Sequence, residues 1–256
     1  MSRLDRFRLW AEETGLRLAA IWSGLAPVRR VAVRQWGAQA ARTRRFPLSW
    51  GTAYVVAFSL FSMAFIDRPL ALLLKSGVTG DWNGFFQTVT NLGRAGFYLV
   101  PAALLTLFFW LESQGTIHPD GAARWRRKAW KTGFLTLSMA SSGIVELILK
   151  FCIGRYRPRL LFQKGLYGFH PFNFHWAMNS FPSGHSQAIW AAMSALVILA
   201  PRYDLAWLAV AVLVAASRVF ITVHYLSDVV AGSWLGYVGT VLLARILARR
   251  GVHLGP

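Results

Sequence analysis

Long apolar stretches recur along the chain, separated by shorter polar and basic segments. Six of these stretches approach about 20 residues, the length that an α-helix needs to cross the hydrocarbon core of a bilayer. Residues 69–74 are also apolar, but this segment is far too short to cross. The pattern therefore predicts an all-α membrane protein, a polytopic bundle of six transmembrane helices. These helices are expected at residues 48–66, 95–111, 132–151, 183–200, 205–222 and 229–248.

The composition agrees with this pattern. Of the 256 residues, 55% are hydrophobic and only 15% are charged, whereas soluble domains carry about 25% charged residues. The chain is therefore neither a disordered tail protein nor an ordinary soluble globule. Its 12 Trp residues fit a membrane protein, because amphipathic rings collect at bilayer interfaces. The single cysteine, Cys152, excludes an internal disulfide framework and a Cys-based metal cluster.

Residues 1–47 form a basic segment ahead of the membrane domain, which is expected at residues 48–250. The segment contains ten arginines. Its longest early apolar run, residues 18–22, is too short for a secretory signal. Its apolar positions recur at roughly helical spacing, which leaves two interpretations: an amphipathic helix lying on an anionic leaflet, or a basic tail that fixes the topology. The apolar face is thin, which favours the tail.

The positive charges indicate an orientation. If the N-terminus lies inside, 19 of the 28 Lys and Arg residues fall on the inner side and nine on the outer side. The excess of inner charges predicts that both termini are cytoplasmic. A net charge of +18 is also typical of nucleic-acid-binding proteins, but the six spans assign it to cytoplasmic loops, and no nucleic-acid partner is expected. Five outer cations lie within residues 150–164, and a phosphate ligand would explain them.

Three short polar segments adjoin the predicted spans, at residues 150–158, 181–186 and 217–228. In the six-span arrangement all three reach the same membrane face. They contain residues suited to binding a phosphoryl group: fixed cations, a hydroxyl, and a backbone N–H that no side chain shields at the start of a helix. The expected phosphate-binding residues are Lys150, Arg157, Ser183, Gly184 and Arg218.

Two histidines in these segments suggest covalent catalysis. His224 and Asp228 are four residues apart, so the carboxylate can accept the Nδ1–H of the imidazole and leave Nε2 as a nucleophile. His185 is then available to protonate the leaving oxygen and later to activate water. No carboxylate cluster of metal-ligand type lies nearby, so neither Mg²⁺ nor Zn²⁺ nor any other cofactor is expected.

The ordered motifs K-x6-RP, PSGH and SR-x5-H-x3-D resemble the type 2 phosphatidic acid phosphatase superfamily. All eleven specified positions are present between residues 150 and 228. The resemblance implies a six-helix membrane phosphatase with His224 as nucleophile, His185 as acid and base, and Asp228 as the residue that orients His224. It also implies that Lys150, Arg157, Ser183, Gly184 and Arg218 bind the phosphate.

The expected function is that of a metal-independent phosphatase in a bacterial inner membrane, with its site facing the periplasm. Its substrate is expected to be a lipid phosphate or pyrophosphate, of the undecaprenyl pyrophosphate, phosphatidic acid or phosphatidylglycerol phosphate type. The alternatives are a lipid A phosphatase, or a lipid phosphotransferase in which a hydroxyl group replaces water. A non-enzymatic anion-binding membrane protein explains the motifs less well, because it gives the His224–Asp228 pair no purpose.

Two further features have alternative interpretations. Glu146 is an acid within a span, which indicates function by default, but it also lies four residues before Lys150, at the spacing of a helical ion pair that would position the lysine. The ion pair is favoured. Gly232 and Gly236 form a GxxxG pattern, which predicts packing within the bundle more than dimerisation.

Overall fold

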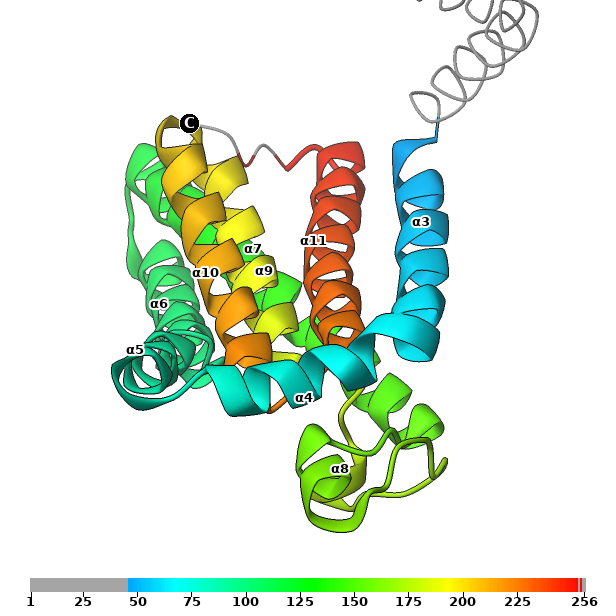
Figure 1. Ribbon diagram of the computed structural model, residues 1–256. Coiled ribbons are helices and arrows are strands. Elements are labelled where there is room, and N and C mark those ends of the chain that lie inside the picture. The colour runs from blue at the N-terminus through cyan, green and yellow to red at the C-terminus, as the bar shows by residue number, and fades with distance from the viewer. Residues whose placement is uncertain (1–45, 253, 255–256) are drawn as a thin grey trace, which may run out of the picture. The chain divides into compact units, whose positions relative to one another are not determined.

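The computed structural model of the chain describes residues 46–252 and residue 254 (Figure 1). Residues 52–256 form one compact unit. In the described part of the chain, the only β-type pairing is an isolated bridge between Arg155 and Phe169. The predicted basic segment 1–47 lies outside the described residues, apart from Phe46 and Pro47.

Long and short helices follow one another along the described chain. The elements are α3 (Pro47–Phe61), a π-helical turn η1 (Ser62–Ile66), α4 (Asp67–Gly77), α5 (Gly80–Asn91), α6 (Gly96–Gly115), α7 (Pro119–Ile153), α8 (Pro158–Lys164), the 3₁₀ turn η2 (Trp176–Met178), α9 (Gly184–Leu199), the 3₁₀ turn η3 (Pro201–Tyr203), α10 (Asp204–Phe220) and α11 (Leu226–Arg249).

Six helices account for the six predicted membrane crossings. Among the described residues, five helical stretches are long and apolar enough to cross a membrane. The sixth crossing is α9, an apolar helix of only 16 residues. The prediction of a six-helix, all-α membrane bundle is therefore confirmed. The largest difference in boundaries is at α7, which begins at Pro119 rather than at residue 132.

Helix α9 is the centre of the bundle, where it packs against α7, α10 and α11. Its buried side chains are mostly small, such as Ala188, Ala191 and Ala192. Small residues let helix backbones approach closely, which matters in lipid because apolar surface alone does not drive helices together. The predicted GxxxG pattern serves this packing: a Cβ at Gly236 would collide with the α9 backbone, and one at Gly232 with the backbone of Ser183, which precedes α9.

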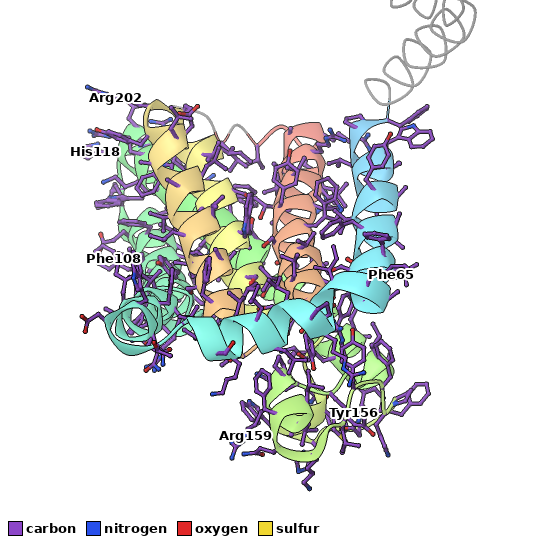
Figure 2. All side chains as sticks on the ribbon, viewed as in Figure 1. Phe65, Phe108, His118, Tyr156, Arg159 and Arg202 are labelled. Carbon is purple, nitrogen blue, oxygen red and sulfur yellow. The ribbon has the colours of Figure 1, made fainter. Side chains whose placement is uncertain are left out.

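The outward faces of the bundle carry large apolar side chains. Phe65 and Phe108 are examples, exposed on opposite sides of the view in Figure 2. In water such a surface would be unfavourable, but in a bilayer it faces hydrocarbon of equal polarity. The distribution of exposed apolar residues is therefore that of a membrane-embedded bundle.

The chain bends sharply between α3 and α4. The π-helical turn Ser62–Ile66 marks the bend, and α4 then runs across the ends of α10 and α11 rather than alongside them (Figure 1). Residues 69–74, which were too short to cross, are part of this transverse helix. Asp67 is buried at the start of α4.

The two ends of the bundle carry different parts of the chain. His118 and Arg202 mark one end, and Tyr156 and Arg159 mark the other (Figure 2). We call the end with Tyr156 and Arg159 the site end. Among the described residues, the basic start of α7 and Arg202, which are predicted to be inner, thus lie at the end opposite Arg159, which is predicted to be outer.

Candidate active site

The three polar segments of the sequence meet at the site end. The first segment follows α7, the second begins α9, and the third joins α10 to α11 (Figure 1). Backbone hydrogen bonds connect them: the N–H of Ser183 donates to the carbonyl of Asp228 at 2.9 Å, and the N–H of Ser180 donates to the carbonyl of Arg155 at 3.0 Å. The structure therefore gathers all three motifs into one site.

His224 and Asp228 face each other in the buried part of this site. The Nδ1 atom of His224 lies 3.5 Å from Oδ2 of Asp228. The same oxygen accepts hydrogen bonds from Ser180 Oγ at 2.6 Å and from the backbone N–H of Tyr225 at 2.9 Å. Because Nδ1 is directed toward the carboxylate, Nε2 is the nitrogen left to react.

The backbone between these two residues is not a single helical turn, although they are four positions apart. His224 lies in the turn before α11, and Asp228 lies in the first turn of that helix, where its carboxylate caps the N–H of Tyr225. Burial lowers the pKa of His224 well below 6.5, although its hydrogen bond with Asp228 acts in the opposite direction. The ring is therefore neutral, and thus nucleophilic, at neutral pH.

The second motif begins helix α9. Ser183 is the residue immediately before the helix, and Gly184 is its first residue. The first backbone N–H groups of a helix have no partner within it, so this end attracts an anion. Ser183 is fully buried, and its hydroxyl accepts a hydrogen bond from Ser186 Oγ at 3.0 Å. Both residues are therefore placed where a phosphate can receive hydrogen bonds from the helix end.

Lys150 and Glu146 lie directly beside this helix end. The Nζ atom of Lys150 is 2.6 Å from Oε1 of Glu146, which is the ion pair that the spacing predicted. A Cβ at Gly184 would approach Glu146 Oε1 to 2.7 Å and Lys150 Nζ to 3.4 Å. A larger residue at position 184 would therefore displace the ends of these two side chains.

Arg157 is held firmly by the loop that precedes α9. Its Nε donates to the carbonyl of Trp176 at 2.9 Å, and its guanidinium lies over the Trp176 ring at 4.2 Å. Burial lowers the pKa of Arg157 to about 10, against the raising effects of Asp228 and Glu146. The side chain therefore stays charged at neutral pH, with one face already occupied by the ring.

Arg218 completes the set of cations. It is 8% exposed, and its Nη1 donates to Thr90 Oγ1 at 2.8 Å. Its Nε is buried and has no hydrogen-bond partner among the described residues. An unpaired buried donor is costly, and an anion at this position would satisfy it.

His185 lies in the first turn of α9, within the electrostatic reach of Lys150, Arg157 and Arg218. Its ring also packs against the turn between α5 and α6, since a Cβ at Gly93 would lie 3.1 Å from His185 Cδ2. The structure thus brings together all eight residues that the sequence predicted for the site. Within the described residues, no three His, Cys, Asp or Glu side chains are grouped as a metal site.

Sequence reasoning missed several residues at this site. In the sequence, Arg155 is one of the five outer cations within residues 150–164, and Asp67 is the acid that follows the predicted span 48–66. Both are buried. Arg155 pairs directly with Asp228, and Asp67 pairs with Arg155. Ser180 and Thr90 were missed as well. A basic residue between two motif positions and an acid at a span end were the available signals, but neither indicates a partner.

Comparison with known proteins supports the motifs. Residues 131–251 match the PAP2 superfamily. The chain is 39% identical over 212 residues to a lipid A 1-phosphatase of Rhizobium etli, which covers 80% of this chain and 88% of the relative. A lipid A 1-phosphatase of Rhizobium johnstonii is 31% identical over 212 residues, covering 80% of this chain and 84% of the relative.

Two solved structures share the fold. One is the first transmembrane PAP2-type phosphatidylglycerolphosphate phosphatase from Bacillus subtilis, with a TM-score of 0.51, 21% identity, and coverage of 77% of this chain and 96% of that one. The other is LpxE from Aquifex aeolicus, with a TM-score of 0.50, 21% identity, and coverage of 70% and 95%.

The helical bundle, its site and these relatives define a multi-pass bacterial membrane phosphatase that acts on a lipid phosphate. The chain belongs to the PAP2 superfamily, the family that its three motifs predicted.

Proposed function

We propose that this chain removes the phosphate from carbon 1 of lipid A. The observation that carries the proposal is the 39% identity to a lipid A 1-phosphatase across 88% of that relative. The similarity covers 80% of this chain, so it extends well beyond residues 131–251, which contain the phosphate motifs. The sequence alone favoured polyprenyl and glycerophospholipid phosphates over lipid A, and the similarity to two lipid A 1-phosphatases supports lipid A instead.

In the first chemical step, Nε2 of His224 attacks the phosphorus atom. The bond from phosphorus to the lipid oxygen breaks, and His185 gives that oxygen a proton. Asp228 supports the positive charge that develops on the His224 ring. Lys150, Arg157 and Arg218 stabilise the phosphoryl oxygens together with the start of α9.

In the second step, water attacks the phosphorus of phosphohistidine. His185, now unprotonated, accepts a proton from that water, and the phosphorus–nitrogen bond to His224 breaks. Inorganic phosphate leaves, and both histidines return to their starting states. The basic side chains supply the positive charge that the phosphoryl group needs in both steps.

The same proposal includes an orientation in the inner membrane, with both termini cytoplasmic and the site end facing the periplasm. Among the described residues, Arg202, which is predicted to be inner, and Arg159, which is predicted to be outer, lie at opposite ends of the bundle (Figure 2). This separation supports a single direction for the positive-inside rule. A site at the outer face suits a lipid whose phosphate is hydrated and whose chains remain in the bilayer.

The test is phosphate release from a panel of lipid phosphates by the purified protein in detergent micelles. Lipid A should lose one phosphate, at carbon 1, with one inorganic phosphate released per molecule. The His224→Ala variant serves as the control for contaminating phosphatases. Mass spectrometry of the product identifies which phosphate was lost.

Two other outcomes would overturn parts of the proposal. Turnover of phosphatidic acid or undecaprenyl pyrophosphate without turnover of lipid A would refute the substrate. Loss of the lipid phosphate without release of inorganic phosphate, and with a second lipid phosphorylated, would identify a phosphotransferase.

A further inference from the structure

A buried cluster of charges lies behind the candidate nucleophile. Arg155 is 1% exposed, and it is placed between two carboxylates. Its Nη1 donates to Oδ1 of Asp228 at 2.5 Å, and its Nη2 donates to Oδ2 of Asp67 at 2.8 Å. Both carboxylates are as deeply buried as the arginine. The order of groups is therefore Asp67, Arg155, Asp228 and His224.

Arg155 alone would weaken the electrostatic effect of Asp228 on His224. A cation 2.5 Å from a carboxylate cancels most of the negative charge that a third group can feel. Asp228 must nevertheless support positive charge on His224, whose Nδ1 lies 3.5 Å from the other carboxylate oxygen. A second carboxylate on Arg155 resolves this conflict, because it neutralises the arginine and leaves Asp228 with its charge.

The position of Asp67 is fixed from several sides. One of its oxygens accepts hydrogen bonds from Ser62 Oγ at 2.7 Å and from the backbone N–H of Ser227 at 3.1 Å. The other accepts from Ser227 Oγ as well as from Arg155. These contacts connect the bend before α4 to the first turn of α11. These hydrogen bonds therefore fix the position of the Asp67 carboxylate.

Arg155 is also fixed and permanently charged. Its Nη2 donates to the hydroxyl of Tyr167 at 3.0 Å, and its guanidinium lies over the Tyr225 ring at 4.3 Å. Burial alone lowers the pKa of Arg155, but Asp228 and Asp67 outweigh burial and raise the pKa above its ordinary value. The arginine cannot relieve the conflict by losing its proton.

We propose that Asp67 and Arg155 are positioning residues for the reaction of His224. Arg155 fixes the carboxylate of Asp228, and Asp67 neutralises Arg155 so that Asp228 can stabilise the phosphorylated ring. The inference rests on the proposed phosphohistidine chemistry. It makes the transverse helix α4, which provides no group to the phosphate, a part of the catalytic apparatus.

The experiment compares Asp67→Asn with the double variant Asp67→Asn/Arg155→Gln. In the single variant, Asp228 is the one remaining carboxylate that pairs with Arg155, so less of its negative charge acts on His224. We therefore expect kcat to fall by about ten-fold or more, while KM changes by less than about two-fold. Inhibition by inorganic phosphate should be unchanged, because the phosphate-binding residues are intact. The double variant removes both charges, and its kcat should recover part of the loss.

Asp204→Asn is the matched control, because Asp204 is an exposed acid in the first turn of α10, far from the site end. Thermal unfolding in detergent shows whether each variant folds. A double variant with a lower kcat than Asp67→Asn would overturn the electrostatic role. A single variant whose kcat is normal, or in which only KM is raised, would overturn it as well. The comparison uses whichever lipid phosphate the wild-type protein hydrolyses. A wrong substrate assignment would therefore show in the wild-type panel and not in the ratio between variants.

Discussion

At the scale of single residues, the two histidines of the site have different surroundings. His224 is almost fully buried, and a carboxylate lies at its Nδ1. His185 is only partly buried, lies in the first turn of α9, and is surrounded by cations instead. A ring held by a carboxylate is suited to carry positive charge, whereas His185 lies beside the cations that would bind the phosphate and can exchange a proton there. The surroundings support the division into nucleophile and acid–base residue.

The division predicts different defects in the two alanine variants. His224→Ala should abolish hydrolysis and the covalent intermediate. His185→Ala should greatly slow cleavage of a lipid phosphate, whose alkoxide needs a proton, but should affect nitrophenyl phosphate much less in the first step. With that substrate, His185→Ala should release a burst of nitrophenol and then stall, because the second step lacks its base. Rapid-quench measurement of nitrophenol release detects the burst.

The trapped phosphate provides the control. It should be acid-labile and alkali-stable, as a phosphoramidate is, and should map to His224 by mass spectrometry. Turnover of nitrophenyl phosphate by the wild-type protein must be shown first. Phosphate on Ser183, or on no residue at all, would contradict the assigned roles.

Motif residues were predictable at this scale because their spacing has a chemical meaning. His224 and Asp228 are near in sequence, and the cations share one membrane face. Asp67 and Arg155 are separated by 88 positions, and nothing in the sequence pairs an acid at a span end with one of nine outer cations. Only the bend before α4 brings them together.

At the scale of helices, close packing of α9 and α11 determines where the site residues lie. A Cβ at Gly236 would collide with the backbone at Gln187 and approach the N atom of Ala191 to 2.8 Å. Thr240 Oγ1 donates to the carbonyl of Ala191 at 3.3 Å along the same contact. Because Asp228 begins α11 and Ser183 precedes α9, this contact fixes the distance between two parts of the site.

Gly236→Ala should therefore force the two helices apart. Overpacking of this kind costs about 1–3 kcal/mol, which should appear as a lower midpoint of thermal unfolding, followed by tryptophan fluorescence in detergent. Gly84→Ala in α5 is the matched control, because a Cβ there meets nothing within 4 Å. That control should raise stability by about 0.5–1 kcal/mol, as alanine does in a helix interior. An equal effect of both substitutions would contradict the packing argument.

The spans were predictable from hydropathy because every crossing needs a long apolar run. The segments that connect the spans were harder to predict. Helix α7 begins at Pro119, in a polar stretch ahead of the apolar part that was predicted to cross the membrane. This extension was missed because a polar composition does not distinguish a helix from a loop. The conformation of the turn between α10 and α11, where Thr222 adopts a positive φ of 52°, likewise could not be predicted from the spacing of His224 and Asp228.

At the scale of the whole molecule, the separation of charges between the two ends carries the proposed orientation. The basic first part of α7 and Arg202 belong to the end opposite the site. If this basic end is cytoplasmic, as the positive-inside rule predicts, the site faces outward. The orientation stays a prediction from charge counts, because the rule uses only the order of spans and loops.

Cysteine labelling in spheroplasts tests the orientation. In a Cys152→Ser background, which removes the chain's single cysteine, Ala123→Cys in α7 should resist an impermeant thiol reagent. Gln163→Cys in α8 should react rapidly, since both positions are exposed but lie at opposite ends of the bundle. The reverse pattern would invert the topology and place the site in the cytoplasm.

The short length of the central helix α9 bears on the depth in the bilayer at which a lipid phosphate would be bound. With 16 residues, α9 rises about 24 Å at about 1.5 Å per residue, less than the ~30 Å of hydrocarbon that it stands in. We expect its first turn, which the proposed mechanism makes the phosphate site, to lie below the level of the surrounding head groups. A substrate would then have to move toward the hydrocarbon to present its phosphate, and hydrolysis should depend on bilayer thickness.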